Sequence, residues 1–302
     1  MKQILWNNHP LSRLCLGTVQ LGLSYGIANT KGKPTAEESG KILSAVTQSG
    51  INCFDTALAY GNSEQVLGNF FRHKDEKFYI ITKISSKELL SNPAILENSL
   101  QRLKLDKIFA VLLHDSILLD NTAEFALKMG YIKEKYTDYV GVSIYTNEEF
   151  SKAVVHPLID IIQIPFNLFD QRAISLGWID KAKKNNKLLF IRSIFLQGLL
   201  LLDPKAADEK VSGSGILLEK IDTLAHELIL TRAQLALSFV MSAAPDAVII
   251  FGCETYDQAL QNIENFEQIQ NLTPDTMDTL FTLFNATPES IYLPSKWQQT
   301  NG

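Results

Sequence analysis

Short apolar runs alternate with segments of helical period along almost the whole chain of 302 residues, and this alternation limits the folds available to it. Runs rich in β-branched or aromatic residues predict eight strands, at about 14–18, 52–56, 78–84, 107–114, 138–144, 159–165, 187–194 and 247–252. Most are continuous apolar runs, as expected of strands buried on both faces. Helical periodicity predicts helices at about 36–48, 64–71, 94–105, 124–136, 148–155, 173–185, 216–229, 232–242, 256–267 and 274–285.

Eight strand–helix units in about 300 residues predict an α/β fold, a closed (β/α)8 TIM barrel. The competing doubly wound sheet requires a GxGxxG turn after its first strand, and LGTVQLGLSYG lacks that spacing. No Pro-, Gly- or Ser-rich linker divides the chain, so we expect residues 1–302 to form a single domain. An N-terminal hairpin over 2–13 is expected to close the barrel floor, and the polar loop 203–215 is expected to be a mobile flap.

Composition and charge exclude several classes of function. The net charge of −5 and the lack of a basic run argue against a nucleic-acid partner. No stretch approaches the roughly 20 apolar residues of a membrane span, and the N-terminal sequence lacks the apolar core of a signal peptide, so we expect a cytoplasmic protein. Three widely spaced cysteines without HxH or HExxH motifs predict no metal site. No apolar stripe indicates a stable protein partner, so a monomer or weak dimer is expected.

Ionisable residues end three consecutive predicted strands. Asp55 ends the second strand, Lys83 lies near the end of the third, and His114 ends the fourth, while Tyr60 follows Asp55 by five residues. In a TIM barrel these strand ends meet at one rim, where functional groups gather. An unpaired acid at the end of a buried strand is costly, so we expect Lys83 to pair with Asp55.

This cluster suits the delivery of a proton to a carbonyl group. A nearby ammonium favours the phenolate, so Lys83 is expected to lower the pKa of Tyr60 towards neutrality and make it a general acid. Asp55 would hold Lys83 charged and oriented, and His114 would hydrogen-bond the substrate oxygen. Because no nucleophile stands beside its own base, reduction of a small-molecule carbonyl substrate by an external hydride fits best.

Several segments resemble the aldo-keto reductase family, in the same order and at similar spacing across nearly the whole chain. They are GINCFDTALAYGNSEQVLG, IITKI, VLLHD, VGVSIY, IIQIPFN and AVIIFGCETYDQALQNIENF. The resemblance implies a (β/α)8 barrel that binds a nicotinamide cofactor without a Rossmann domain and reduces aldehydes or ketones with NAD(P)H. It places the family's catalytic tetrad on the same four residues, Asp55, Tyr60, Lys83 and His114.

The resemblance also implies a set of cofactor-binding residues. Those expected at the nicotinamide are Thr18, Ser143 and Gln163. Those expected at the pyrophosphate are Ser193 and the loop from Leu196 to Leu199, which includes Gly198. Those expected at the adenosine end are Gly252, Thr255, Gln258 and Asn262.

Three positions depart from the family pattern. Ile144 stands where many members have Asn, so one amide contact is lost or replaced. Arg192 stands where an aromatic ring often stacks on the nicotinamide, and we expect it either to favour the reduced, uncharged cofactor or to reach an anionic substrate group. Glu254 stands where members commonly have a basic or polar residue for the 2′-phosphate of NADP. The family default is NADP(H), and Glu254 makes NAD(H) an alternative because a carboxylate repels that phosphate.

Two functions remain open at this point. The first is a catalytic carbonyl reductase, an NAD(P)-dependent oxidoreductase. The second is a cofactor-sensing regulatory barrel that acts through a protein partner; a sensor can lose tetrad residues, and this chain keeps all four. The aromatic residues Tyr25, Tyr145 and Phe166 lie just past predicted strand ends, where they are equally compatible with substrate walls and with barrel packing.

Overall fold

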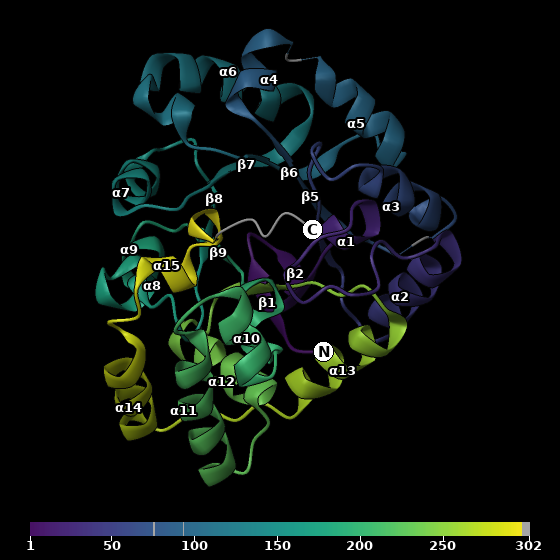
Figure 1. The fold of residues 1–302 in the computed structure, drawn as a ribbon. Helices are drawn as coiled ribbons and strands as arrows, with labels where there is room; N and C mark the ends of the chain where they lie inside the picture. The colour runs from purple at the N-terminus through teal and green to yellow at the C-terminus, as the bar shows by residue number, and fades with distance from the viewer. Residues whose placement is uncertain (75, 93, 298–302) are drawn as a thin grey trace.

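Eight parallel strands form a closed barrel in the computed structural model, which describes residues 1–74, 76–92 and 94–297 (Figure 1). The strands follow one another around the barrel in the order β10-β3-β4-β5-β6-β7-β8-β9. They are β3 (Leu14–Gly17), β4 (Cys53–Asp55), β5 (Tyr79–Ile84), β6 (Ile108–Leu113), β7 (Thr137–Ser143), β8 (Ile161–Pro165), β9 (Leu188–Arg192) and β10 (Val248–Phe251). The predicted TIM barrel is confirmed, and every predicted strand lies within a residue or two of an observed one.

Helices surround the barrel on all sides (Figure 1). They are α1 (Val19–Gly22), α2 (Ala36–Gln48), α3 (Ser63–Phe71), α4 (Ser86–Ser91), α5 (Ile95–Leu103), α6 (Thr122–Lys135), α7 (Asn147–Val155), α8 (Arg172–Ser175), α9 (Trp178–Lys184), α10 (Pro204–Lys210), α11 (Ser214–Glu227), α12 (Arg232–Ala243), α13 (Tyr256–Glu267), α14 (Pro274–Phe284) and α15 (Glu289–Tyr292). Short 3-10 turns are η1 (Ile117–Asp120), η2 (Leu196–Leu201) and η3 (Pro294–Lys296). Within the described ranges no single helix is long and apolar enough to cross a membrane; α11 and α12 reach that length and hydropathy only together, and they are bent by 85°.

The alternation of side chains along each strand divides the core into two layers. On β4, Cys53 belongs to the apolar cluster inside the barrel, whereas Phe54 belongs to the larger cluster between the barrel and the helices. Since successive side chains point to opposite faces, Asp55 is directed back towards the barrel axis at the carboxyl end. The same alternation on β9 brings Arg192 to this rim. The strand pattern therefore positions polar groups above an apolar barrel interior.

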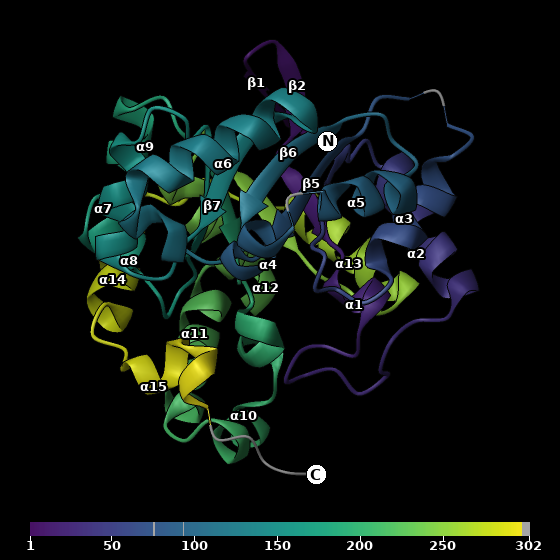
Figure 2. The ribbon, with the colours of Figure 1, turned by 90° about the horizontal axis from the view of Figure 1, so that it is seen from above.

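The N-terminal hairpin of β1 (Gln3–Trp6) and β2 (His9–Ser12) closes the other end of the barrel, where the sequence predicted it. The ring of Trp6 lies 4.5 Å from that of Tyr139, centroid to centroid, and 6.4 Å from that of Phe109. His9 Nε2 lies 3.1 Å from the hydroxyl of Tyr139. Figure 2 shows the hairpin projecting at one end of the molecule, with α10 and α15 at the opposite end.

Two sequence predictions are wrong. The helix predicted over 173–185 is two helices, α8 and α9, because Gly177 between them adopts a left-handed φ of 67°. The segment 203–215, predicted to be a loop, instead contains α10 and the start of α11. Asp203 caps α10 by accepting hydrogen bonds from the backbone of Lys205 and Ala206, and proline begins that helix, so local capping gives this segment a regular structure.

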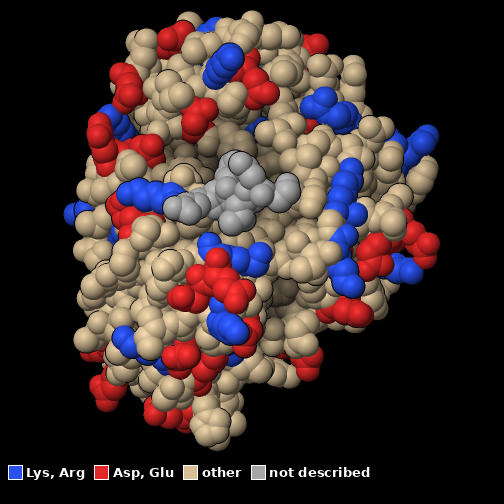
Figure 3. Space-filling model, viewed as in Figure 1, with Lys and Arg blue, Asp and Glu red and all other residues tan. Residues whose placement is uncertain are grey.

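Charged side chains of both signs are interspersed over the face shown in Figure 3. Among the coloured residues of that view, neither sign gathers into one continuous patch. Such a mixture is typical of a solvated surface.

Replacing Gly68 by alanine is expected to lower the free energy of unfolding by about 1–3 kcal/mol. Gly68 lies where α3 meets α5, and a Cβ there would stand 2.0 Å from the backbone oxygen of Arg102. Gly130→Ala in α6 is the matched control, because a Cβ there meets nothing within 4 Å. Alanine should stabilise that helix interior by about 0.5–1 kcal/mol. Urea denaturation measures both variants, and equal shifts would show that the contact with α5 does not constrain position 68.

Candidate active site

A buried ion pair lies at the carboxyl end of the barrel. Lys83 Nζ on β5 lies 2.6 Å from Asp55 Oδ2 on β4, and the two side chains are only 1% and 5% exposed. The other oxygen of Asp55 accepts a hydrogen bond at 2.8 Å from Nε2 of Gln163 on β8. The pairing predicted between Lys83 and Asp55 is therefore present, and a strand from across the barrel supports it.

The ammonium of Lys83 also reaches the loop that follows β4. It donates hydrogen bonds to the backbone oxygen of Thr56 at 2.8 Å and to the hydroxyl of Tyr60 at 3.5 Å. Burial acts to lower the pKa of Lys83, but Asp55 and Tyr60 outweigh it and raise that pKa above its ordinary value. Lys83 is thus positively charged throughout the neutral range, with a partner for each of its N–H groups.

The predicted lowering of the Tyr60 pKa is wrong. Burial raises the pKa of this phenol, and the positive charge of Lys83 offsets only part of that effect. Taking a phenolate out of water costs more free energy here than the neighbouring ammonium returns. Tyr60 is therefore protonated at neutral pH, which is the form that a proton donor requires.

His114 follows β6 and meets Tyr60 edge to face, with ring centroids 5.7 Å apart and an interplanar angle of 80°. Burial lowers the pKa of His114 to about 4, and the charge of Lys83 acts in the same direction. The imidazole is consequently neutral at physiological pH, with one N–H donor and one acceptor nitrogen. It can donate a hydrogen bond to a ligand oxygen without bringing a second positive charge to the site.

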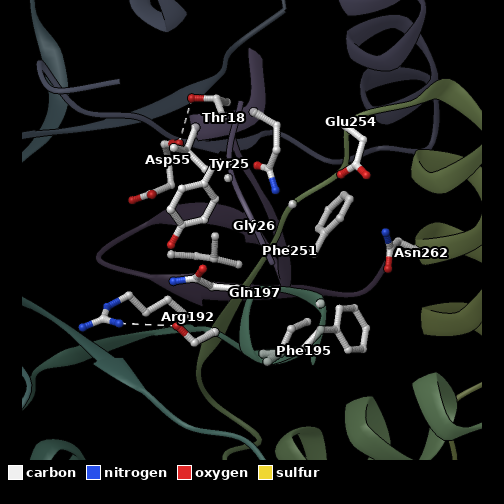
Figure 4. A pocket seen from close by; sticks show the side chains of 18 of the residues that line it. Thr18, Tyr25, Gly26, Asp55, Arg192, Phe195, Gln197, Phe251, Glu254 and Asn262 are labelled. Carbon is white, nitrogen blue, oxygen red and sulfur yellow. Dashed lines mark hydrogen bonds between the residues drawn. The ribbon is translucent and has the colours of Figure 1, made fainter. Parts of the chain in front are cut away.

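A cavity of about 640 Å³ opens above this cluster (Figure 4). Asp55, Tyr60 and His114 line it, whereas Lys83 lies fully buried behind them. The expected cofactor-binding residues that line it are Thr18, Ser143, Gln163, Arg192, Ser193, Gly198, Gly252, Glu254, Gln258 and Asn262.

Three of the expected cofactor-binding residues do not line the cavity. Leu196 and Leu199 are fully buried in the core. Thr255 begins α13 as its N-cap and accepts a hydrogen bond from the backbone of Gln258. A motif match along the sequence does not distinguish a residue that packs in the core or caps a helix from one that lines the cavity.

The cavity has features that fit a nicotinamide dinucleotide. Gln20 Oε1 is buried and has no hydrogen-bond donor in the described structure. It lies close to Gly252, since a Cβ on that glycine would stand 2.8 Å from it. After β9, Leu196, Gln197 and Gly198 all have left-handed φ angles. Backbone turns of this irregular kind form concave anion sites, and strain of this kind gathers at ligand-binding loops. An elongated ligand with phosphates and amide donors matches both features.

Sequence reasoning missed a contact between two loops across the cavity. The backbone N–H of Ala28, in the loop after β3, donates to the carbonyl oxygen of Gln197, after β9, at 3.4 Å. A Cβ on Gly198 would stand 2.5 Å from the Cβ of Ala28, so only glycine allows this approach. The cavity lining missed from the sequence includes Gln20, Gly26, Phe195 and Phe251. Gly26 and Gly198 were the sequence signal for this contact, because glycine permits two backbones to approach closely.

The structure distinguishes cavity lining from barrel packing for the three aromatic residues that the sequence could not assign. Tyr25 and Tyr145 line the cavity, with 40% and 47% exposure respectively. Phe166 is instead fully buried and packs 5.3 Å from the ring of Phe239. Ile144, at the first departure from the family pattern, is also fully buried, in the outer core layer.

Comparison with known proteins adds a family and a fold. A family model described as the aldo/keto reductase family matches residues 13–283. No curated protein shows significant sequence similarity to the chain.

Similar solved structures cover nearly the whole chain. A glycerol dehydrogenase from Gluconobacter oxydans has 20% identity and a TM-score of 0.76, over 95% of this chain and 97% of that one. An aldo-keto reductase from Bacillus halodurans in its holo form has 19% identity and a TM-score of 0.76, over 97% and 98%. An aldo/keto reductase from Klebsiella pneumoniae in complex with NADP and acetate has 19% identity and a TM-score of 0.72, over 94% and 95%. At these identities the likeness establishes the fold.

Lowering the pH from 6.5 towards 4 is expected to destabilise the folded chain through His114. In the unfolded chain this imidazole takes up a proton near pH 6.5, whereas in the folded chain it does so only near pH 4. The unfolded state therefore binds more protons in this window, and the free energy of unfolding falls with pH.

Comparing His114→Gln with the wild type by urea denaturation at pH 7 and pH 4.5 isolates this contribution. The wild type should lose about 1–3 kcal/mol more than the variant. His73→Gln is the control, because that side chain is exposed and should leave the pH dependence as it is. An identical pH dependence in all three proteins would contradict the low pKa of His114.

Proposed function

Since this chain belongs to the aldo/keto reductase family, we propose that it is an NAD(P)H-dependent carbonyl reductase with Tyr60 as its general acid. Its substrate is a small molecule with an aldehyde or ketone group. Membership of the family supports oxidoreductase activity. The observation that carries the finer proposal is the buried Lys83–Asp55 pair, in contact with a protonated phenol at the inner end of a cavity that fits a dinucleotide.

The nicotinamide cofactor supplies the hydride when it is bound. Tyr60 gives its proton to the carbonyl oxygen, and negative charge then develops on the phenol oxygen. Lys83, 3.5 Å from that oxygen, stabilises this charge as it forms. Asp55 keeps Lys83 charged and in place, and neutral His114 donates a hydrogen bond that orients the carbonyl oxygen. Because its pKa is raised, Tyr60 carries its proton before the reaction but is a weaker acid, so stabilisation by Lys83 is needed as the proton leaves.

The cofactor is NADP(H) by family default, with NAD(H) as the alternative. Structures of the Klebsiella pneumoniae relative are described with NADP and with NADPH. Glu254 lies towards the end of the cavity away from Asp55 (Figure 4). Its backbone N–H donates to Gln258 Oε1 at 2.9 Å, and its carboxylate has no cationic partner within 4.0 Å in the described ranges. A free carboxylate there supports tolerance of NADH, because it would repel a 2′-phosphate.

Tyr60→Phe is expected to reduce turnover by at least about 100-fold, the scale of a lost general acid. Cofactor affinity should change little, since the phenyl ring remains. Loss of absorbance at 340 nm with NADPH or NADH, across a panel of aldehydes, ketones, sugars and keto acids, measures turnover, and fluorescence titration measures binding. Normal turnover in the variant would refute the role of Tyr60. Tight cofactor binding by the wild type with no turnover of any substrate would favour a regulatory barrel that senses the cofactor.

Glu254→Gln is expected to raise affinity for NADPH relative to NADH by about tenfold, equivalent to about 1.4 kcal/mol. Glu267→Gln, an exposed residue at the end of α13, the helix that follows Glu254, is the control for the loss of one negative charge. The ratio of the two dissociation constants, measured by fluorescence titration, reports the effect. If the wild type already binds NADPH more than about 100-fold tighter than NADH, Glu254 does not face the 2′ position and the interpretation fails.

A further inference from the structure

Arg192 brings a positive charge to the cavity that the proton-delivering cluster does not require. Its guanidinium is partly buried, yet within the described residues its N–H groups donate only to the backbone oxygen of Ile144 at 3.2 Å and to Ser193 Oγ at 3.4 Å. Neither acceptor is charged. Arg172 and Arg232 both pair with aspartates, whereas no carboxylate of the described residues lies within 4.0 Å of Arg192. A guanidinium in this state has donors available for a ligand.

The guanidinium of Arg192 is held against a fixed aromatic wall. Its Cζ lies 4.1 Å from the ring centroid of Tyr145. The backbone of Tyr145 is itself fastened on both sides: its N–H donates to Glu149 Oε2 at 2.6 Å, and its carbonyl oxygen accepts from Arg172 Nη1 at 2.6 Å. A planar fork that is stacked in this way loses little freedom when it binds a second planar group. It is therefore organised in advance for a bidentate anion.

The charge of Arg192 is concentrated at the reacting end of the cavity. Asp55 and Lys83 neutralise each other there, and among the residues that line the cavity Arg192 carries the positive charge. Arg192 also acts on the pKa values of Tyr60 and His114, lowering both, which places it in the same part of the cavity. Figure 4 shows Arg192 and Asp55 towards one end and Glu254 towards the other. An anion that enters the cavity is drawn to the end where the carbonyl is reduced.

We propose that Arg192 binds a carboxylate on the carbonyl substrate, so that the preferred substrates are aldehydes or ketones that also carry a carboxylate. A single guanidinium matches the single charge and the planar oxygens of this group. The inference rests on the proposed reductase function and names its substrate class. It selects the second of the two roles that the sequence left open for Arg192, contact with an anionic substrate group.

Two pairs of aldehydes matched in carbon skeleton test the proposal: 4-oxobutanoate with butanal, and 2-carboxybenzaldehyde with benzaldehyde. The readout is the ratio of kcat/KM for the acid to kcat/KM for the neutral aldehyde, at saturating NADPH, because effects common to both substrates cancel. We expect the wild type to favour the acid at least tenfold in one pair. Arg192→Gln should reduce that ratio by about 10-fold to 100-fold, mainly through KM, which is the scale of a lost hydrogen bond to a charged group.

Two further variants separate charge from geometry. Arg192→Lys keeps the charge but loses the fork, so the ratio should fall by about threefold to tenfold; this variant also serves if Arg192→Gln does not fold. Arg72→Gln removes one exposed positive charge at the end of α3, outside the cavity lining, and should leave the ratio unchanged. If Arg72→Gln lowers the ratio as much as Arg192→Gln does, the preference arises from long-range electrostatics, and direct contact between Arg192 and the carboxylate is overturned.

The outcomes distinguish this inference from the proposed function. If the wild type reduces all four aldehydes with no preference for the acids, or if Arg192→Gln leaves the ratio unchanged, the inference is overturned and the reductase function stands. If the wild type reduces none of them, the result counts against the reductase function, and the affinity for a carboxylate then tests the role of Arg192. Calorimetric titration of succinate into the NADPH-loaded protein should then show at least tenfold tighter binding to the wild type than to Arg192→Gln, and equal affinities would overturn it.

Discussion

The buried ion pair between Asp55 and Lys83 is the interaction on which the rest of the site depends. Its partners come from adjacent strands, and Gln163 reaches the same carboxylate from β8. Loss of either charged partner would leave the other buried without compensation, at a cost of about 3–5 kcal/mol. The closed barrel is the condition for this arrangement, because only closure brings β8 within reach of the end of β4. Fold stability and the chemistry of the site therefore share these residues.

Burial around this pair gives the neighbouring groups their protonation states. It raises the pKa of Tyr60 and lowers that of His114, so both are neutral at physiological pH. Lys83 remains charged because Asp55 and Tyr60 compensate for its own burial. The site thus holds a proton donor, a neutral hydrogen-bond donor and a fixed positive charge within one cluster. Such a preorganised set stabilises charge that develops during a reaction without a large rearrangement.

Loops supply much of the cavity wall beyond the strand ends. The loops after β3 and β9 touch at Ala28 and Gln197, and they close over the cavity. Tyr145, fastened through its backbone, presents a wall to Arg192. Strand ends therefore carry Asp55, Lys83 and Arg192, and the loops that follow the strands add the remaining cavity wall.

The sequence by itself determined the barrel and predicted that Asp55, Tyr60, Lys83 and His114 form one cluster at its rim. Strand and helix periods are local patterns, and strand ends that meet at one rim place Asp55, Lys83 and His114 together once the fold is known. Tertiary structure decided the direction of the Tyr60 pKa, the stacking of Arg192 on Tyr145 and the break at Gly177. Desolvation and packing sum over segments that are distant in the chain, so they become defined only when the barrel closes. A local sequence pattern therefore does not determine the total desolvation and packing at one residue.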